Sequence, residues 1–186
     1  MTLTQQAFWF LRHGETDWNA KGLSQGNVDI PLNPTGIAQA HAAAALLARR
    51  GIRSIVASPL SRAHDTALQA AATIGRDVVL EEELREVSFG MQEGQVMAEW
   101  FDEWVEGHVT PEGAETFAAL RARAVRAVNR ALAYESPVLI VAHGALFRAL
   151  RAEMNLAPNV RTPNATPYFC QPGRAPTDPW TLTPAA

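Results

Sequence analysis

The chain has 186 residues, of which 47% are hydrophobic and 19% charged, a composition that can bury the core of one domain. Its formal net charge of −3 argues against a nucleic-acid or anionic-membrane partner, and its single cysteine, Cys170, excludes an intrachain disulfide. No apolar run approaches the roughly 20 residues that span a bilayer, and no basic segment followed by a long apolar stretch begins the chain, so the cytoplasm is the expected location.

Apolar runs typical of strands alternate with segments of helical periodicity. The proline at 34 marks the start of the first helix, and the helix at 115–134 shows apolar residues every three or four positions with arginines on its other face. The proline-rich end of the chain predicts a short edge hairpin around 166–170 and 179–183. In chain order, the other expected elements are a strand at 7–11, a helix at 32–51, a strand at 52–58, a helix at 60–75, a strand at 77–81, a helix at 115–134, a strand at 137–143 and a helix at 145–154.

This alternation predicts an α/β fold, a three-layer sandwich in which helices flank a mostly parallel central sheet. We see no internal repeat and no linker that would divide the chain, so residues 1–186 are expected to form a single domain. Two segments stand apart from the alternating pattern: a short lid-like insertion at about 92–113 and the proline-rich C-terminal segment 158–186.

Three of the predicted strands end in polar residues. The first runs into Arg12 and His13, the second is followed by Arg62, and the third ends at His143 and Gly144. If these strands are parallel neighbours, their carboxyl ends meet at one edge of the sheet. Two imidazoles and two guanidinium groups gathered there favour a bound anion, and a phosphate matches the arginine forks and the helix N-termini that follow the strands.

The same residues predict phosphoryl chemistry. A neutral His13 is a competent nucleophile toward phosphorus near pH 7, and a protonated His143 could donate to a phosphoryl oxygen. Glu86, which follows the short strand at 77–81, could protonate the leaving alcohol and then act as a base toward water. Glu83 and Glu93 lie close by in sequence, and composition alone does not choose among the three carboxyl groups.

Six segments carry a resemblance to a known family. They are LRHGETDWN (11–19), SQGNVDIPLNPTGIAQA (24–40), ASPLSRAHDTA (57–67), LREVSFGMQEG (84–94), PEGAETF (111–117) and VAHGALFRAL (141–150). Together they resemble the histidine phosphatase superfamily, the phosphoglycerate-mutase-like enzymes, and within it the phosphatase branch. The resemblance covers most of residues 8–150, is specific because independent segments agree in order, and implies a phosphoglycerate-mutase-like fold.

The resemblance implies catalytic or phosphate-binding roles for nine residues. It also implies that the reaction uses no metal and no cofactor. His13 is implied as the phosphorylated nucleophile and Glu86 as the proton donor, a choice that favours Glu86 over its neighbours. Residues implied to hold the phosphate or line its pocket are Arg12, Arg62, His143, Asn19, Gln25, Gly26 and Gly144. One departure is Gln92, which stands where phosphatase relatives often carry tryptophan, at a position expected near the entrance; it leaves substrate preference open.

The predicted function is a metal-independent phosphomonoesterase that hydrolyses small phosphorylated metabolites through a phosphohistidine. The runner-up is a mutase that returns the phosphoryl group to a sugar acid, but only about twenty residues follow Glu86 before the turn at 111–113, a short cover against water. A phosphate-binding protein without turnover is less favoured because the reactive residues are all present. The expected partner is a small phosphate ester, with neither nucleic acid nor membrane, and the oligomeric state is left open, with a homodimer among the options.

Two further expectations concern substrate contacts. Trp100 and Trp104, four residues apart, have the spacing of one helix face; core packing is the first interpretation and substrate contact the second. Arg85 and Arg148 are candidates for binding a second anionic group, from their positions in the sequence alone.

Overall fold

Six strands form one sheet in the order β3-β2-β4-β1-β5-β6 in the computed structural model, which describes residues 1–186. Four neighbouring strands are parallel, and the last two form an antiparallel hairpin at one edge. The mostly parallel sheet and the edge hairpin predicted from the sequence are therefore confirmed. The strands are β1 (Phe8–Arg12), β2 (Ser54–Ala57), β3 (Val78–Leu80), β4 (Val138–Ala142), β5 (Pro167–Gln171) and β6 (Thr181–Pro184).

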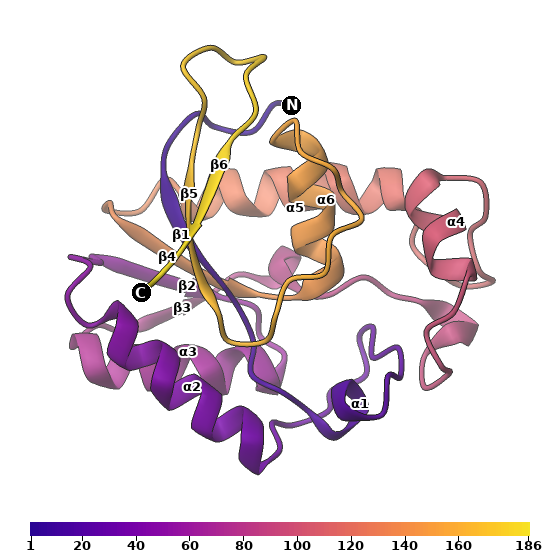
Figure 1. Ribbon diagram of the computed structural model, residues 1–186, viewed down its shortest axis with the longest axis horizontal. Coiled ribbons are helices and arrows are strands. Elements are labelled where there is room, and N and C mark those ends of the chain that lie inside the picture. Colours follow the sequence, from indigo (N-terminus) through magenta and orange to yellow (C-terminus); the bar gives the residue numbers. More distant parts are fainter.

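Helices cover both faces of this sheet (Figure 1). On one face lie α2 (Pro34–Leu47) and α3 (Ser61–Ile74), and on the other lie α5 (Phe117–Ala131) and α6 (Gly144–Glu153). Two apolar clusters fill the two interfaces: Phe10 belongs to the cluster with α5 and α6, and its neighbour Leu11 belongs to the cluster with α2 and α3. Successive side chains of a strand point to opposite faces, so β1 must be apolar throughout. This confirms the three-layer sandwich.

The helix ends follow capping rules. The side chain of Asn33 accepts a hydrogen bond from the Gly36 amide at 2.8 Å and starts α2, while Gly75, with a left-handed φ of 74°, ends α3 as predicted. The predicted range 32–51 is too long for α2, because the chain leaves the helix after Leu47 and turns toward β2. No helix of the structure has the length and apolarity needed to cross a membrane.

Four short helical segments were not predicted. They are too short to show a period, since the longest, α4, has seven residues. The first, α1, is held by a capping box in which Thr16 and Asn19 exchange hydrogen bonds. These segments are α1 (Asp17–Ala20), α4 (Trp100–Glu106) and the two 3₁₀ turns Glu82–Leu84 and Gly90–Gln92.

The loop after β1 lies directly against the start of α2. A Cβ atom on Gly36 would lie 2.0 Å from the Glu15 carbonyl oxygen, and one on Gly14 would lie 2.4 Å from the Gly36 carbonyl oxygen. The Glu15 side chain also accepts a hydrogen bond from Asn33 at 3.0 Å. Only glycines allow this approach, so the residues around His13 are fixed by backbone contact with α2.

We expect Trp104→Ala to lower the free energy of unfolding by about 3–5 kcal/mol, because this fully buried ring packs against Phe89, Phe101 and Phe117. Its indole N–H also donates to the Glu115 carbonyl at 2.9 Å. Urea unfolding measures the loss. Trp100→Ala, at a partly exposed position, is the control and should cost less than half as much; an equal cost would contradict the placement of Trp104 in the core.

Candidate active site

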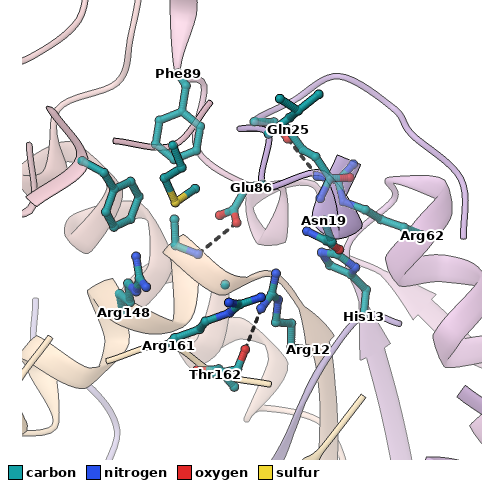
Figure 2. A pocket seen from close by; sticks show the side chains of 17 residues that line it. Arg12, His13, Asn19, Gln25, Arg62, Glu86, Phe89, Arg148, Arg161 and Thr162 are labelled. Carbon is teal, nitrogen blue, oxygen red and sulfur yellow. Dashed lines mark hydrogen bonds between the residues drawn. The ribbon is translucent and has the colours of Figure 1, made fainter. Parts of the chain in front are cut away.

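A cavity of about 320 Å³ opens beyond the carboxyl ends of the parallel strands. It collects side chains from β1, α1, α3 and α6 and from the loops between them (Figure 2). Eight of the nine predicted site residues line it: Arg12, His13, Asn19, Gln25, Gly26, Arg62, Glu86 and Gly144. The ninth, His143, is fully buried next to His13, with its ring centroid 5.2 Å from that of His13. The structure thus brings all nine together.

His13 is held in one orientation and kept neutral. Its Nδ1 lies 2.7 Å from the Gly14 carbonyl oxygen, and because a carbonyl only accepts, Nδ1 carries the hydrogen. The lone pair is then on Nε2. Burial lowers the pKa of His13 well below its usual value, and the charges of Arg62 and Arg12 lower it further. His13 is therefore a neutral imidazole with a free nucleophilic nitrogen at neutral pH.

The fully buried Arg62 and the partly buried Arg12 line the same cavity as His13. The terminal nitrogens of Arg62 donate to the carbonyls of Gly26 at 2.8 Å and Val28 at 2.9 Å, and one terminal nitrogen of Arg12 donates to the Thr162 carbonyl at 2.6 Å. Burial lowers the pKa of both guanidinium groups to about 10, so both remain charged near pH 7. The Nε atom of each arginine is buried without a hydrogen-bond partner.

His143 presents a third unpartnered nitrogen. Its Nε2 lies 2.7 Å from the Ser58 hydroxyl, while its Nδ1 is buried with no partner. Burial, followed by the charge of Arg62, lowers the pKa of His143 well below its usual value, so the protonated His143 expected from the sequence is wrong and the ring is neutral near pH 7. Buried polar atoms are nearly always paired, so the unpartnered nitrogens of Arg12 and Arg62, which line the cavity, and of His143, whose ring lies 5.2 Å from that of His13, indicate a ligand with several acceptor oxygens. An anion there would also offset the repulsion between the arginines.

Glu86 lies at the wall of the cavity and caps α6. Its carboxylate oxygens accept hydrogen bonds from the amides of Ala145 and Leu146, both at 2.9 Å, in the first turn of α6. The N-cap residue itself, His143, makes no capping bond with its side chain. A remote glutamate thus satisfies the helix end, and this fixes the carboxyl group at the cavity.

The competing carboxyl groups lie elsewhere. Glu83 is paired with Arg126 and Arg130, and Glu93 accepts hydrogen bonds from the amides of Asn27 and Phe89, both at 3.1 Å. Neither lines the cavity. Of the three glutamates that the sequence offered, only Glu86 lines the cavity.

Specific contacts also place Gly144, Asn19 and Gln25 at the cavity. Gly144 leaves room for the Arg12 guanidinium, because a Cβ atom would lie 3.3 Å from its Nε. The side-chain oxygen of Asn19 accepts from the Thr16 amide at 3.2 Å and from Asn164 at 3.1 Å, which leaves its amide nitrogen for a ligand. The oxygen of Gln25 is likewise bound to the Thr16 hydroxyl at 2.7 Å.

One wall of the cavity was missed by sequence reasoning. Its residues come from the segment before and within α4 and from the loop before β5, and no local pattern marks them. They are Phe89, Met97, Phe101, Arg161 and Thr162. The one available signal was the interruption of the alternating pattern at 92–113 and 158–186.

Several predicted substrate contacts do not occur in the structure. Trp104 is in the core and Trp100 packs against it, so the first interpretation of these residues is correct and the second is wrong. Gln92, on the 3₁₀ turn Gly90–Gln92, does not line the cavity. Arg148 lines the cavity, whereas Arg85 pairs with Glu82 at the surface.

Comparison with known proteins agrees with this geometry. The sequence model of the histidine phosphatase superfamily (branch 1) matches residues 8–165, most of the chain. The chain belongs to the histidine phosphatase superfamily. The resemblance seen in the sequence and the phosphoglycerate-mutase-like fold are thereby confirmed.

Members of the superfamily with different names are similar to this chain. A bifunctional protein of Mycobacterium tuberculosis is 40% identical over 144 residues, which cover 72% of this chain and 40% of that protein. A Yersinia pestis protein named as a phosphoglycerate mutase is 35% identical over 148 residues, covering 73% of this chain and 68% of that protein. The chain thus spans about 40% of the length of the first of these relatives.

Among solved structures, the mycobacterial glucosyl-3-phosphoglycerate phosphatase in complex with VO3 superimposes with a TM-score of 0.82. It is 31% identical in sequence, and the match covers 95% of this chain and 97% of the other. The histidine phosphatase fold therefore accounts for almost the whole of this chain.

Proposed function

We propose that this chain is a metal-independent phosphomonoesterase that hydrolyses small phosphorylated metabolites through a phosphohistidine on His13. The observation that carries the proposal is the set of three unpartnered buried nitrogens: those of Arg12 and Arg62 at the cavity that His13 also lines, and that of His143, whose ring lies 5.2 Å from the neutral His13 ring with its free Nε2. A phosphoryl group supplies the negative charge that offsets the two arginines, and its oxygens can accept hydrogen bonds from the unpartnered nitrogens. The cavity, about 320 Å³, has the size of a small-metabolite site.

The reaction has two steps. In the first, Nε2 of His13 attacks phosphorus, the bond from phosphorus to the ester oxygen breaks, and protonated Glu86 gives its proton to the departing alkoxide. In the second, Glu86 takes a proton from water as the water oxygen attacks phosphorus, the bond to Nε2 breaks and inorganic phosphate leaves. Arg12, Arg62 and His143 bind the non-bridging oxygens through both steps.

The charge of the cavity supports chemistry without a metal. Its lining carries four arginines and a single carboxylate, Glu86, whose oxygens already accept amide hydrogen bonds. A divalent cation would be repelled by this set, which offers it too few oxygen ligands. The one cluster with the spacing of a metal site, Glu103, Glu106 and His108, is exposed and lies outside the cavity.

Hydrolysis is preferred to mutase chemistry because little chain covers the site. The segment between Glu86 and α5 acts as a short lid within a single domain; besides Phe89 it contributes only Met97 and Phe101 to the cavity. Water can then reach the phosphohistidine. Relatives with both names occur, and the phosphatase-named structure that superimposes over 95% of this chain supports this choice.

The decisive experiment is hydrolysis of an aryl phosphate in excess EDTA, together with a rapid acid-free quench that preserves phosphohistidine. We expect full activity with EDTA and phosphate attached to the peptide that contains His13, in an acid-labile and base-stable linkage. Loss of activity that added divalent metal restores would overturn metal independence. Turnover with no trapped phosphoenzyme at saturating substrate and early times, or phosphate on another residue, would overturn the proposed intermediate.

The lowered pKa of His13 predicts that kcat/KM is retained to a lower pH than a histidine of ordinary pKa would allow. Since the pKa of His13 lies well below 6.5, the imidazole stays neutral as the pH falls from about 7.5 to about 6, and its nucleophilic form is lost only below that range. After correction for ionisation of the ester, kcat/KM should therefore not fall over this range. An acid limb with its midpoint near 6.5 would show a histidine of ordinary pKa.

A further inference from the structure

Two arginines on the wall of the cavity have no part in the reaction described above. Arg148, from α6, and Arg161, from the loop before β5, both line the cavity. In Figure 2, Arg148 lies on the far side of Glu86 from His13, and Arg161 lies between Arg148 and Arg12. Since Glu86 is placed to protonate the departing alcohol, this far side is where the alcohol must lie.

Neither arginine has a carboxylate partner. Six other arginines form ion pairs with glutamates: Arg53, Arg85, Arg121, Arg123, Arg126 and Arg130. Arg148 and Arg161 form none. The chain has more acidic than basic residues, and still neither of these guanidinium groups has a carboxylate within ion-pair distance.

Arg148 is held in place by its surroundings. Its guanidinium group lies over the Phe101 ring, 4.4 Å from the centroid, so α4 supports one face of it. Asn159 donates a hydrogen bond to Asp102 of α4 at 2.7 Å and ties the loop that carries Arg161 to the same helix. The bond from Arg12 to the Thr162 carbonyl fixes the other end of that loop. The Arg148 guanidinium and the loop that carries the exposed Arg161 are thus positioned before any ligand binds.

The charges of the cavity exceed what one phosphate can neutralise. Four guanidinium groups and one carboxyl group among its lining residues leave three positive charges when Glu86 is ionised and four when it is protonated for the first step, counting both histidines as neutral. A phosphate monoester dianion offsets two of them, so at least one positive charge remains. Phe89, Met97 and Phe101 give the cavity an apolar part, and the Phe101 ring lies against Arg148, which suits a short carbon skeleton between two charged ends.

We propose that Arg148 and Arg161 form a subsite for a second anionic group, a carboxylate or a second phosphate, on the alcohol part of the substrate. This proposal rests on the proposed function, because it assigns the alcohol to the far side of Glu86. It narrows the substrates to phosphorylated acids or bisphosphates, and it makes Arg148 a specificity residue.

The test compares substrates that differ only in the second charge. 3-Phosphoglycerate and glycerol 3-phosphate share a three-carbon skeleton, and 1,3-propanediol bisphosphate beside its monophosphate replaces the carboxylate by phosphate. We expect wild type to hydrolyse the doubly anionic member of at least one pair with the higher kcat/KM. The pair that shows this preference identifies the second anion as a carboxylate or a phosphate. Arg148→Gln should lower that ratio of kcat/KM values about tenfold or more, and Arg161→Gln should lower it in the same direction, because a charge-assisted pair is lost.

Arg174→Gln is the matched control, since it removes the same charge from an exposed position outside the cavity and should leave the ratio unchanged. The subsite is overturned if wild type shows no preference, or if the ratio in Arg148→Gln stays within twofold of wild type. Failure of wild type to hydrolyse any ester, including an aryl phosphate, would instead overturn the proposed function. Calorimetric titration of the same pairs into His13→Ala, with and without Arg148→Gln, then decides the subsite without turnover.

Discussion

His13→Ala should lower kcat for phosphate-ester hydrolysis by about 10⁴-fold or more while leaving the protein folded. The substitution removes the only unprotonated nucleophilic nitrogen that faces the cavity, and loss of a covalent nucleophile has effects of this order or larger in other hydrolases. The arginines that bind phosphate remain, so affinity for inorganic phosphate should change much less than kcat. Steady-state rates and competitive inhibition by phosphate measure the two effects separately.

The matched control for this variant is His41→Ala, which removes an imidazole from an exposed position of α2. Its rate should equal that of wild type. Far-ultraviolet circular dichroism and thermal unfolding of both variants show whether the fold is retained. If folded His13→Ala keeps more than about 1% of wild-type kcat, the phosphohistidine mechanism is wrong.

Glu86→Gln should have an effect that depends on the leaving group. General acid catalysis contributes roughly 10²–10⁴-fold, and it matters most when the departing oxygen is a poor leaving group. We therefore expect kcat/KM for an alkyl phosphate to fall by about that factor, while that for a nitrophenyl phosphate, whose phenolate leaves without protonation, falls far less. A plot of log kcat/KM against the pKa of the leaving alcohol should be steeper in the variant.

Glu86→Gln also disturbs α6, because an amide has one acceptor oxygen where the carboxylate uses two. That disturbance lowers the rates for all esters equally, so the difference between alkyl and aryl esters reports the lost acid alone. Glu83→Gln is the control, since Glu83 competes with Glu86 in the sequence but lies outside the cavity. An equal fall for both ester types would assign Glu86 a positioning role only.

The parts of this protein that were predictable from sequence are those with local signals. The strands β1 and β4 are apolar on both faces, and the polar residues that end them must lie at one edge of a parallel sheet, so Arg12, His13 and His143 could be placed together. The same reasoning failed for α4. In so short a helix the register decides which aromatic side chain faces the cavity, and the structure selects Phe101 rather than Trp100 or Trp104.

The far wall of the site was not predictable because it depends on contacts between distant parts of the chain. Arg161 reaches the cavity only because the loop before β5 passes over the ends of β1 and β4, where Arg12 binds a carbonyl 150 positions away. Such a contact leaves no periodicity in the sequence. Proline-rich composition marked this segment as irregular and gave no sign that it lines the cavity.

The bonds between Arg12 and Thr162 and between Asn164 and the His13 carbonyl, the latter at 3.0 Å, have a consequence for how the chain can be divided. All nine predicted site residues and all four parallel strands lie before residue 158. A fragment that ended there would carry every reactive group and yet leave the nucleophile loop without its outer clamp. Activity should therefore appear only when the tail is supplied, in the same chain or as a complementing peptide, which makes the position just before residue 158, ahead of Thr162, Asn164 and β5, a natural point for splitting the enzyme into a reconstitutable pair.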